Sequence, residues 1–399
     1  MAPRSCDSAS ARHRAHRRRL DTCGDSVRRH SVTKGGAVQA LIPGRPAEVT
    51  PQWLSTVLSI DGAPVGVAAV DVTPVGTGQT GATYRLSVTY TDAHPDLPAT
   101  FVVKLPSQDE TVRERVALGY RSEHAFYTAM ADRVAVPMPH CYHCDAASDG
   151  ADFVLLLADM SPAVQGDQLA GCREAEARLA VEALAGLHGP TWCDPDLDGM
   201  PGIVMPRPDA DGAKGFGDIA VMAAGITADK LGERMSMQDR DTLSEAMSRV
   251  TPWLLAAGDR FALLHGDFRL DNLLFDPERT RVAVVDWQTL GVGLPARDLA
   301  YFTATSLLPD ERSTLERDLV DRYHAALAGH GVTGYDAEDC WRDYRLGVVQ
   351  APLITALGFA FASSTERGDE MALTMLERGC RAVRELGALE LIDELGRRN

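Results

Sequence analysis

Lysine is the scarcest charged residue of this sequence. Only four occur, Lys34, Lys104, Lys214 and Lys230, so a lysine within a functional pattern is informative. Basic residues as a whole are outnumbered, with 40 Lys and Arg against 56 Asp and Glu and a net charge of −16. Residues 1–34 hold nine of the basic residues, which leaves a more acidic remainder. Because an acidic surface repels phosphate backbones, we expect no nucleic-acid partner.

Long apolar runs and paired cysteines are also missing. No uninterrupted apolar run reaches the ~18 residues that a membrane-spanning helix needs, and the sequence begins without a secretory signal. The eight cysteines are scattered, without the regular spacing of a disulfide framework. We therefore expect a cytoplasmic protein with reduced thiols, no membrane partner, and a monomeric or homodimeric state.

The length of 399 residues suits two domains. Residues 1–37 are rich in Arg and Ser and lack apolar periodicity, which predicts a disordered basic tail. Arg17-Arg18-Arg19 is also compatible with a nucleic-acid or transit signal. We expect an N-terminal lobe over 38–158 and a C-terminal lobe over 159–399.

Periodicity differs between these two lobes. Alternating and β-branched segments predict strands in the first lobe, at 65–75, 83–90, 100–105, 139–144 and 153–157. A helix over 113–130 is expected between the third and fourth strands. Helical spacing dominates after residue 160, at 174–188, 243–257, 311–330, 336–363 and 370–395. The sequence therefore predicts an α+β protein with a small β-rich lobe and a larger, mainly helical lobe.

The segment His265-Gly266-Asp267-Phe268-Arg269-Leu270-Asp271-Asn272 carries a carboxylate and an amide five residues apart. Phosphoryl transfer needs a base for the proton of the attacking hydroxyl, and oxygen ligands for Mg²⁺. One loop can present both groups, and Gly266 allows the backbone to turn tightly before Asp267.

Asp286 follows a short apolar strand, fourteen residues after Asn272. The segments 272–275 and 282–285 are expected to pair as a hairpin, which would bring Asn272 and Asp286 to the same end. A carboxylate at this strand end suits a second metal ligand.

Together these residues resemble the superfamily of aminoglycoside phosphotransferases, choline kinases and ecdysteroid-kinase-like proteins, whose pattern is H-G-D-x4-N followed by an aspartate. The resemblance implies a bilobal protein-kinase-like fold and transfer from ATP, with GTP possible. It implies that Asp267 is the catalytic base and that Asn272 and Asp286 hold Mg²⁺. Asp271 has no ligand role in that pattern, so we interpret it as structural.

Gly76, Gly78 and Gly81 fit G-x-G-x-x-G between two predicted strands. Such a loop covers the nucleotide phosphates in kinases, whereas a helix would follow it in a dinucleotide-binding fold. An ordinary hairpin turn is the alternative interpretation.

Lys104 ends a predicted strand, where an ammonium group could contact the α- and β-phosphates. Glu123 on the following helix is the predicted ion-pair partner, and the family resemblance indicates the same two residues. Glu114 is the competing candidate. An exposed ion pair of little energetic value is the alternative to a functional pair.

The strand at 153–157 leads into Asp159 and Met160. In relatives the backbone at this position pairs with the adenine edge, so the resemblance implies nucleotide contacts for both residues.

Three further features lie outside these motifs. His140-Cys141-Tyr142-His143-Cys144 resembles a metal cluster, yet no second ligand pair is evident, and strand alternation predicts that Cys141 and Cys144 lie on opposite faces. His188 and Asp298 match family positions, and we expect packing or hydrogen bonding for His188 and a buried structural role for Asp298.

The predicted function is phosphoryl transfer to a hydroxyl of a small molecule. A regulatory nucleotide-binding pseudokinase is the alternative from another class, and a protein kinase is disfavoured because Trp287-Gln288 replaces Phe-Gly and no H-R-D loop is present. The apolar segment 348–359 favours an acceptor with apolar character over an aminoglycoside.

Overall fold

A computed structural model describes residues 41–60, 63–75, 81–94, 96–148, 150–256 and 258–397. The predicted tail over 1–37 and the predicted phosphate contacts of Gly76 and Gly78 lie outside these residues. The chain divides into two compact units. The first unit comprises Met1–Met130 and Pro139–Met160, and the second comprises Ala131–Met138 and Ser161–Asn399.

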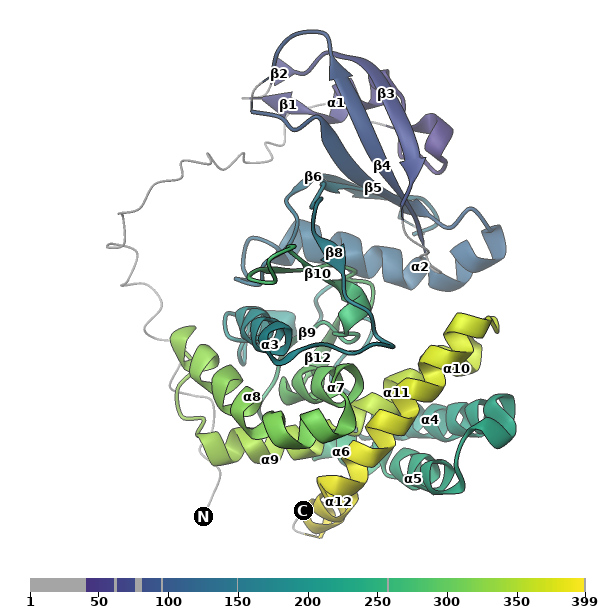
Figure 1. Cartoon of the computed structure of the whole chain (residues 1–399), viewed down its shortest axis with the longest axis vertical. Coiled ribbons are helices and arrows are strands. Elements are labelled where there is room, and N and C mark those ends of the chain that lie inside the picture. Colours follow the sequence, from purple (N-terminus) through teal and green to yellow (C-terminus); the bar gives the residue numbers. More distant parts are fainter. Residues whose placement is uncertain are drawn as a thin grey trace. The chain divides into compact units, whose positions relative to one another are not determined.

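The first unit is built around a five-stranded antiparallel sheet with the strand order β3-β4-β5-β7-β6 (Figure 1). Its strands are β3 (Val67–Pro74), β4 (Gly81–Tyr90), β5 (Thr100–Pro106), β6 (Cys141–Ala146) and β7 (Phe153–Ala158). A short pair, β1 (Ser59–Ile60) and β2 (Ala63–Pro64), lies outside this sheet. The five strands predicted from alternation are all present.

Two helices pack on opposite faces of the sheet. Helix α1 (Pro51–Val57) begins at Thr50, whose hydroxyl accepts a hydrogen bond from the backbone of Trp53. Trp53 and its neighbours pack against the alternate residues Val154 and Leu156 of β7. The other face of β7 packs against Tyr120 of α2 (Glu110–Ala125), which continues into one π-helical turn (Phe126–Met130). Because side chains alternate along a strand, one buried strand serves both cores.

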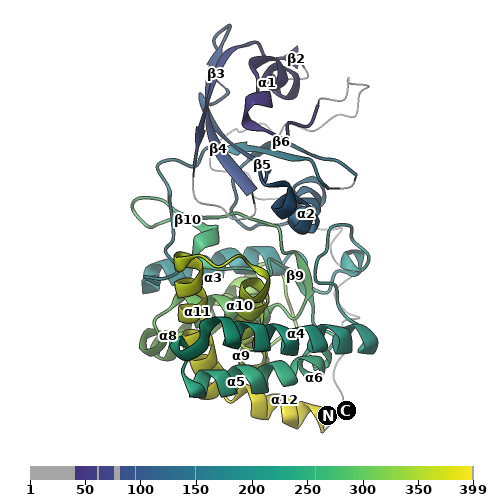
Figure 2. The same ribbon diagram turned by 90° about the vertical axis from the view of Figure 1, so that its right-hand side faces the viewer.

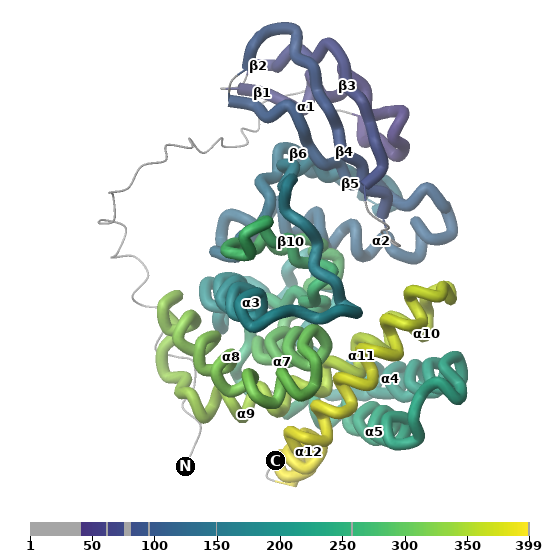
Figure 3. The backbone as a smooth tube through the Cα atoms, in the orientation of Figure 1, coloured from purple at the N-terminus to yellow at the C-terminus, as the bar shows by residue number. Residues whose placement is uncertain are grey.

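The second unit is mainly helical. Its helices are α3 (Glu174–His188), α4 (Ala210–Leu231), α5 (Met237–Ser248), α6 (Val250–Leu255), α7 (Ala296–Ser306), α8 (Pro309–Gly329), α9 (Ala337–Gly347), α10 (Gln350–Phe361), α11 (Glu366–Glu385) and α12 (Ala388–Gly396). Helix α4 packs against α5, α6 and α10 (Figure 2), and α7 packs against α9, α10 and α11 (Figure 3). The predicted α+β class, with the helical part the larger, is confirmed.

Helix α4 was not predicted. Its buried positions are small residues such as Ala213, Gly217, Ala220 and Ala224, so the usual stripe of large apolar side chains is missing.

The helical pattern predicted over 336–363 is present, and it is divided into two helices, α9 and α10. The break before Gln350 places Pro352 in the first turn of α10, where its missing N–H costs no intrahelical bond. By length and composition alone, the stretch Ala337–Phe361 could cross a membrane, but 72% of its most apolar window is buried, as in a core helix.

Short strands frame the segment that contains the H-G-D motif. Strand β9 (Ala262–Leu264) precedes it and pairs with β12 (Gly291–Gly293). Strand β10 (Leu273–Phe275) follows it and pairs with β11 (Val282–Val284) and β8 (Val164–Gln165). The segment is therefore anchored to a paired strand on both sides.

Candidate active site

The backbone of the H-G-D segment is held by one buried carboxylate. The Oδ2 atom of Asp298 accepts a hydrogen bond from the backbone N–H of His265 at 2.6 Å, and its Oδ1 atom accepts one from Gly266 at 3.1 Å. Asp298 is fully buried near the start of α7 and also lies 3.4 Å from Nε2 of His188. The structural roles predicted for Asp298 and His188 are confirmed.

Gly266 turns the chain into the site. Its φ of +82° lies in the left-handed region, and a Cβ placed on it would meet the backbone oxygen of Thr289 at 2.1 Å. Only glycine satisfies both conditions without a shift of the backbone. The tight turn predicted at this position is confirmed.

His265 links the two sides of the site. Its Nε2 atom lies 3.1 Å from the carbonyl oxygen of Val285, and its Nδ1 atom lies 3.3 Å from the backbone nitrogen of Asp267. A carbonyl accepts and a backbone N–H donates, so the pattern assigns a neutral ring with its proton on Nε2. His265 therefore supports the loop and is not itself a proton acceptor for a substrate.

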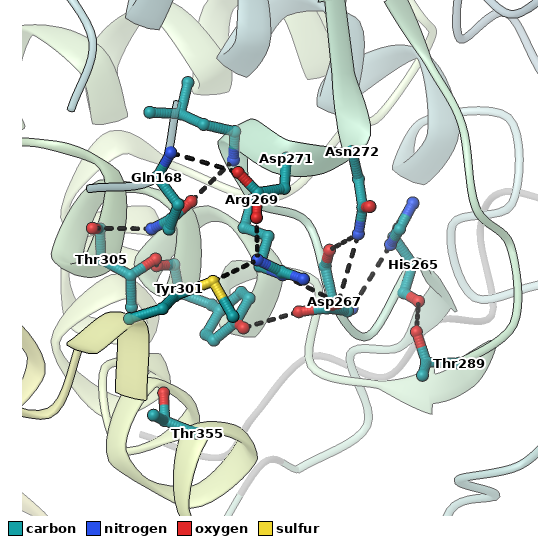
Figure 4. Close-up of polar contacts among 12 residues, drawn as sticks. Gln168, His265, Asp267, Arg269, Asp271, Asn272, Thr289, Tyr301, Thr305 and Thr355 are labelled. Atoms are coloured by element: carbon teal, nitrogen blue, oxygen red, sulfur yellow. Dashed lines mark hydrogen bonds and ion pairs between the residues drawn. The ribbon is translucent and has the colours of Figure 1, made fainter. Parts of the chain in front are cut away.

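The carboxylate of Asp267 is surrounded by donors (Figure 4). Its Oδ1 atom accepts the hydroxyl of Tyr301 at 2.6 Å. Its Oδ2 atom accepts Nε of Arg269 at 3.0 Å and Nδ2 of Asn272 at 3.2 Å. The side chain remains 24% exposed, so its carboxylate is accessible from solvent.

Asn272 is oriented by the same aspartate. Its Nδ2 atom also donates to the backbone oxygen of Asp267 at 2.8 Å. Both partners are acceptors, which fixes the amide nitrogen on their side and turns Oδ1 of Asn272 the other way. The backbone oxygen of Asn272 accepts the N–H of Val285 at 3.0 Å, so the hairpin brings Asn272 beside the residue that precedes Asp286.

Asp286 has a φ of +69°, which is uncommon for a residue other than glycine. The carboxylate of Asp286 and the amide oxygen of Asn272 are both hard oxygen donors, the kind of ligand that Mg²⁺ prefers. In the described part of the chain no group of three or more His, Cys, Asp or Glu side chains is arranged to hold a metal. A carboxylate and an amide oxygen are donors whose chemistry fits a magnesium ion.

A network that the motif alone does not reveal fixes the rest of the loop. Arg269 donates from Nη1 to Asp271 at 2.8 Å and contacts the sulfur of Met371 on α11 at 3.2 Å. Asp271 accepts the backbone N–H of Gln168 at 3.2 Å, and Gln168 accepts the backbone N–H of Leu270 at 2.9 Å. The structural interpretation of Asp271 is confirmed.

Sequence reasoning missed Arg269, Tyr301 and Gln168. Arg269 lies within the motif between Asp267 and Asp271. This alternation of charge could have indicated that the arginine pairs with both aspartates. Gln168 and Tyr301 are distant in sequence from the loop, and no local pattern marks them.

In the first unit, Lys104 lies on the face of β5 that is turned toward α2. Its Nζ atom lies 2.8 Å from Oε2 of Glu123, with the two side chains 13% and 2% exposed. A Cβ on Gly81 would lie 3.2 Å from Cε of Lys104, so the start of β4 runs close beside the lysine side chain. Glu114 is exposed. The preference for Glu123 over Glu114 is confirmed, and the pair is buried rather than superficial.

Asp159 lies at the end of the sheet and forms a two-pronged ion pair with Arg85, with Nε to Oδ2 at 2.8 Å and Nη2 to Oδ1 at 3.3 Å. This contact fixes the side chain of Asp159. The nucleotide contacts expected from the backbone of Asp159 and Met160 stay predictions.

Cys141 and Cys144 share a face of β6, so the predicted separation is wrong. The register of β6 on β7 shifts between Cys141 and His143, and this bulge adds one residue to the alternation. Both cysteines pack against the cluster around Tyr120. A hydrogen bond to Cys141, followed by burial, raises the pKa of Cys144 well above its usual value, so the thiol stays protonated.

Comparison with known proteins identifies the family to which this chain belongs. The model of the phosphotransferase enzyme family matches residues 71–339, which is more than half of the chain and holds every predicted site residue. A choline/ethanolamine kinase family protein from Mesorhizobium loti is 17% identical, with a TM-score of 0.46 over 82% of this chain and 93% of that chain. At this identity and TM-score the likeness assigns no substrate.

Two curated relatives share a shorter segment. Acyl-CoA dehydrogenase family member 10 of Mus musculus is 47% identical over 68 residues, which is 16% of this chain and 6% of the relative. Acyl-CoA dehydrogenase family member 11 of Gallus gallus is 37% identical over 87 residues, which is 21% of this chain and 11% of the relative. The match thus spans only a small part of these longer proteins.

Proposed function

The chain belongs to the phosphotransferase enzyme family, and from this premise we propose that it transfers the γ-phosphoryl group of ATP to a hydroxyl of a small molecule. The observation that carries the proposal is the geometry of Asp267. This carboxylate is partly exposed and is fixed by three side-chain donors. One of these donors is Asn272, which is also a predicted metal ligand.

The residues of the second unit divide the proposed chemistry among them. Asp267 orients the acceptor hydroxyl and receives its proton. Asn272 and Asp286 would hold a magnesium ion, which would neutralise charge on the nucleotide phosphates. Arg269 and Asn272 keep the base in place. The loop therefore acts through position and electrostatics, which is what phosphoryl transfer chiefly requires.

The residues of the first unit bind the nucleotide in this proposal. Glu123 holds Lys104 with its ammonium group available to the α- and β-phosphates. Gly76 and Gly78 would cover the phosphates, and Gly81 leaves room beside Lys104. Asp159 and Met160 would present their backbone to the base of ATP or GTP.

We propose an acceptor with apolar character. Helix α11 reaches the catalytic loop through Met371, and α10, which packs against α11, is largely apolar. The carboxylate of Asp369 is engaged by Ser364 at 2.8 Å and lies 3.9 Å from Arg234. This carboxylate is therefore less available to bind the ammonium groups of an aminoglycoside. Both helices follow residue 339, where the family match ends.

The proposal is tested by replacing the base and one metal ligand. Asp267→Asn should reduce transfer by at least about 100-fold, since it removes proton acceptance from an isosteric side chain. Nucleotide affinity, measured by calorimetry, should change little. Asp286→Ala should instead weaken binding of Mg-ATP. Near-normal turnover of the Asp267 variant would overturn the assignment of the base.

A screen for the acceptor addresses the alternative of a regulatory pseudokinase. Release of ADP or GDP would be followed with hydroxylated sterols, amino alcohols, aminoglycosides and, because of the relatives' names, hydroxyacyl thioesters. Stimulation by one class identifies the acceptor. Tight nucleotide binding without turnover on any alcohol or on water would favour the pseudokinase.

A further inference from the structure

The hydrogen bonds of Asp267 do not fall equally on its two oxygens. A carboxylate offers about two acceptor positions on each oxygen. Oδ2 already accepts two donors, Nε of Arg269 and Nδ2 of Asn272, whereas Oδ1 accepts only the hydroxyl of Tyr301 among the described residues. With respect to the described residues, the acceptor position that remains is therefore on Oδ1.

Tyr301 is suited to hold that oxygen. Its side chain is 1% exposed on α7, and its hydroxyl lies 2.6 Å from Oδ1, a length typical of a hydrogen bond to a charged acceptor. Burial, followed by the negative charge of Asp267, raises the pKa of Tyr301 well above its usual value. The phenol therefore stays protonated and acts as a donor.

The same face of α7 also holds the loop backbone. Asp298 and Tyr301 are three residues apart, and residues at this spacing lie on one face of a helix. Asp298 binds the backbone N–H groups of His265 and Gly266, while Tyr301 binds the side chain of Asp267. One rigid element thus sets both the path of the loop and the rotation of its carboxylate.

We propose that Tyr301 is a positioning residue that makes Oδ1 of Asp267 the proton acceptor in the proposed transfer reaction. The hydroxyl oxygen of the substrate forms a bond to the γ-phosphorus of ATP. The bond between that phosphorus and the β,γ-bridging oxygen breaks, and ADP leaves. The hydroxyl proton passes to Oδ1 and then to solvent. Without the Tyr301 hydroxyl, only the two donors on Oδ2 hold the carboxylate, so the position of Oδ1 is less firmly fixed. This inference rests on the proposed function.

The experiment compares the wild type with Tyr301→Phe and Asp267→Asn. The probe is ADP release from Mg-ATP, with water as the acceptor and with each alcohol of the screen. In Tyr301→Phe we expect kcat to fall about 10- to 100-fold, because a small misplacement of a catalytic group costs this much. The KM for Mg-ATP should stay within about twofold of the wild-type value. The Tyr301 hydroxyl bonds Asp267, which is the proposed base and not one of the residues proposed to bind the nucleotide.

Tyr344→Phe is the matched control. Tyr344 is also fully buried, and its hydroxyl donates to a carboxylate, that of Glu316, at 2.8 Å. It should keep the wild-type kcat. Unchanged kcat in Tyr301→Phe, or an equal loss in both phenylalanine variants, would overturn the positioning role. An inactive wild type or an active Asp267→Asn would instead overturn the proposed function itself.

Discussion

Gly266 illustrates how a single position can shape the catalytic loop. The residue combines a left-handed φ with a close approach to Thr289. The hydrogen bond from Thr289 Oγ1 to the backbone oxygen of His265, at 2.8 Å, ties the turn that contains Thr289 to the loop. A side chain here would displace the backbone that presents Asp267. The requirement for glycine is therefore geometric and independent of any ligand.

Gly266→Ala should lower the free energy of unfolding by roughly 2–4 kcal/mol, from left-handed strain and steric overlap. Activity should fall with it, because Asp267 follows directly. Urea denaturation measures the first effect. Gly215→Ala is the control, since a Cβ added there would meet no atom within 4 Å other than the adjacent backbone of α4. Alanine at this position should stabilise the protein by about 0.5–1 kcal/mol. Equal stability of the two variants would contradict the structural role of Gly266.

At the scale of elements, strand β5 and helix α2 together hold Lys104, the lysine predicted to bind the nucleotide phosphates. Alternation along β5 sends Phe101, Val103 and Leu105 into one core and leaves Lys104 on the face of α2. Helix α2 then supplies Glu123, whose charge is almost fully buried. Since an unpaired buried carboxylate is costly, the two side chains hold each other in place.

Glu123→Gln should raise the KM for Mg-ATP about tenfold, because the loss of one charged hydrogen bond releases the ammonium group of Lys104. Initial rates at varied Mg-ATP would measure the effect. Glu114→Gln on the exposed side of the same helix is the control and should match the wild type. If the two variants behave alike, the Lys104–Glu123 pair has no part in nucleotide binding.

The buried thiols influence the stability of the whole molecule. Cys172, Cys340 and Cys380 are buried, and burial is the largest cause that raises the pKa of each to about 12 from the usual 9.0. Above pH 9 the unfolded chain loses these protons while the folded chain keeps them. The folded state then binds more protons, so its stability must fall as pH rises from 9 toward 12.

The free energy of unfolding should therefore decrease above pH 9 by up to about 1.4 kcal/mol per pH unit for each buried thiol. Urea denaturation at a series of pH values between 8 and 10 would show the slope before the tyrosines of the unfolded chain ionise. Replacing the three cysteines with serine should reduce the slope, whatever it does to stability at pH 7, and the raised pKa of Cys144 should leave a smaller slope in place. An unchanged slope in the triple variant would show that groups other than these three thiols cause it.

The sequence by itself determined the α+β class, the five strands of the first unit, and the residues at which chemistry was expected. Strand alternation and motif spacing are local properties, so Asp267, Asn272, Asp286 and Lys104 could be found without a structure. The choice of Glu123 over Glu114 also followed from the sequence, and contact with Lys104 bears it out.

Only the tertiary structure decided which groups surround these residues. Tyr301 and Gln168 reach the loop from distant segments, so no local pattern could identify them. A bulge in β6 reversed the expected faces of Cys141 and Cys144, because one extra residue changes an alternation of period two. Short sequence motifs identify the residue types that can carry out a reaction. The orientation of a carboxylate depends on partners that only folding brings together.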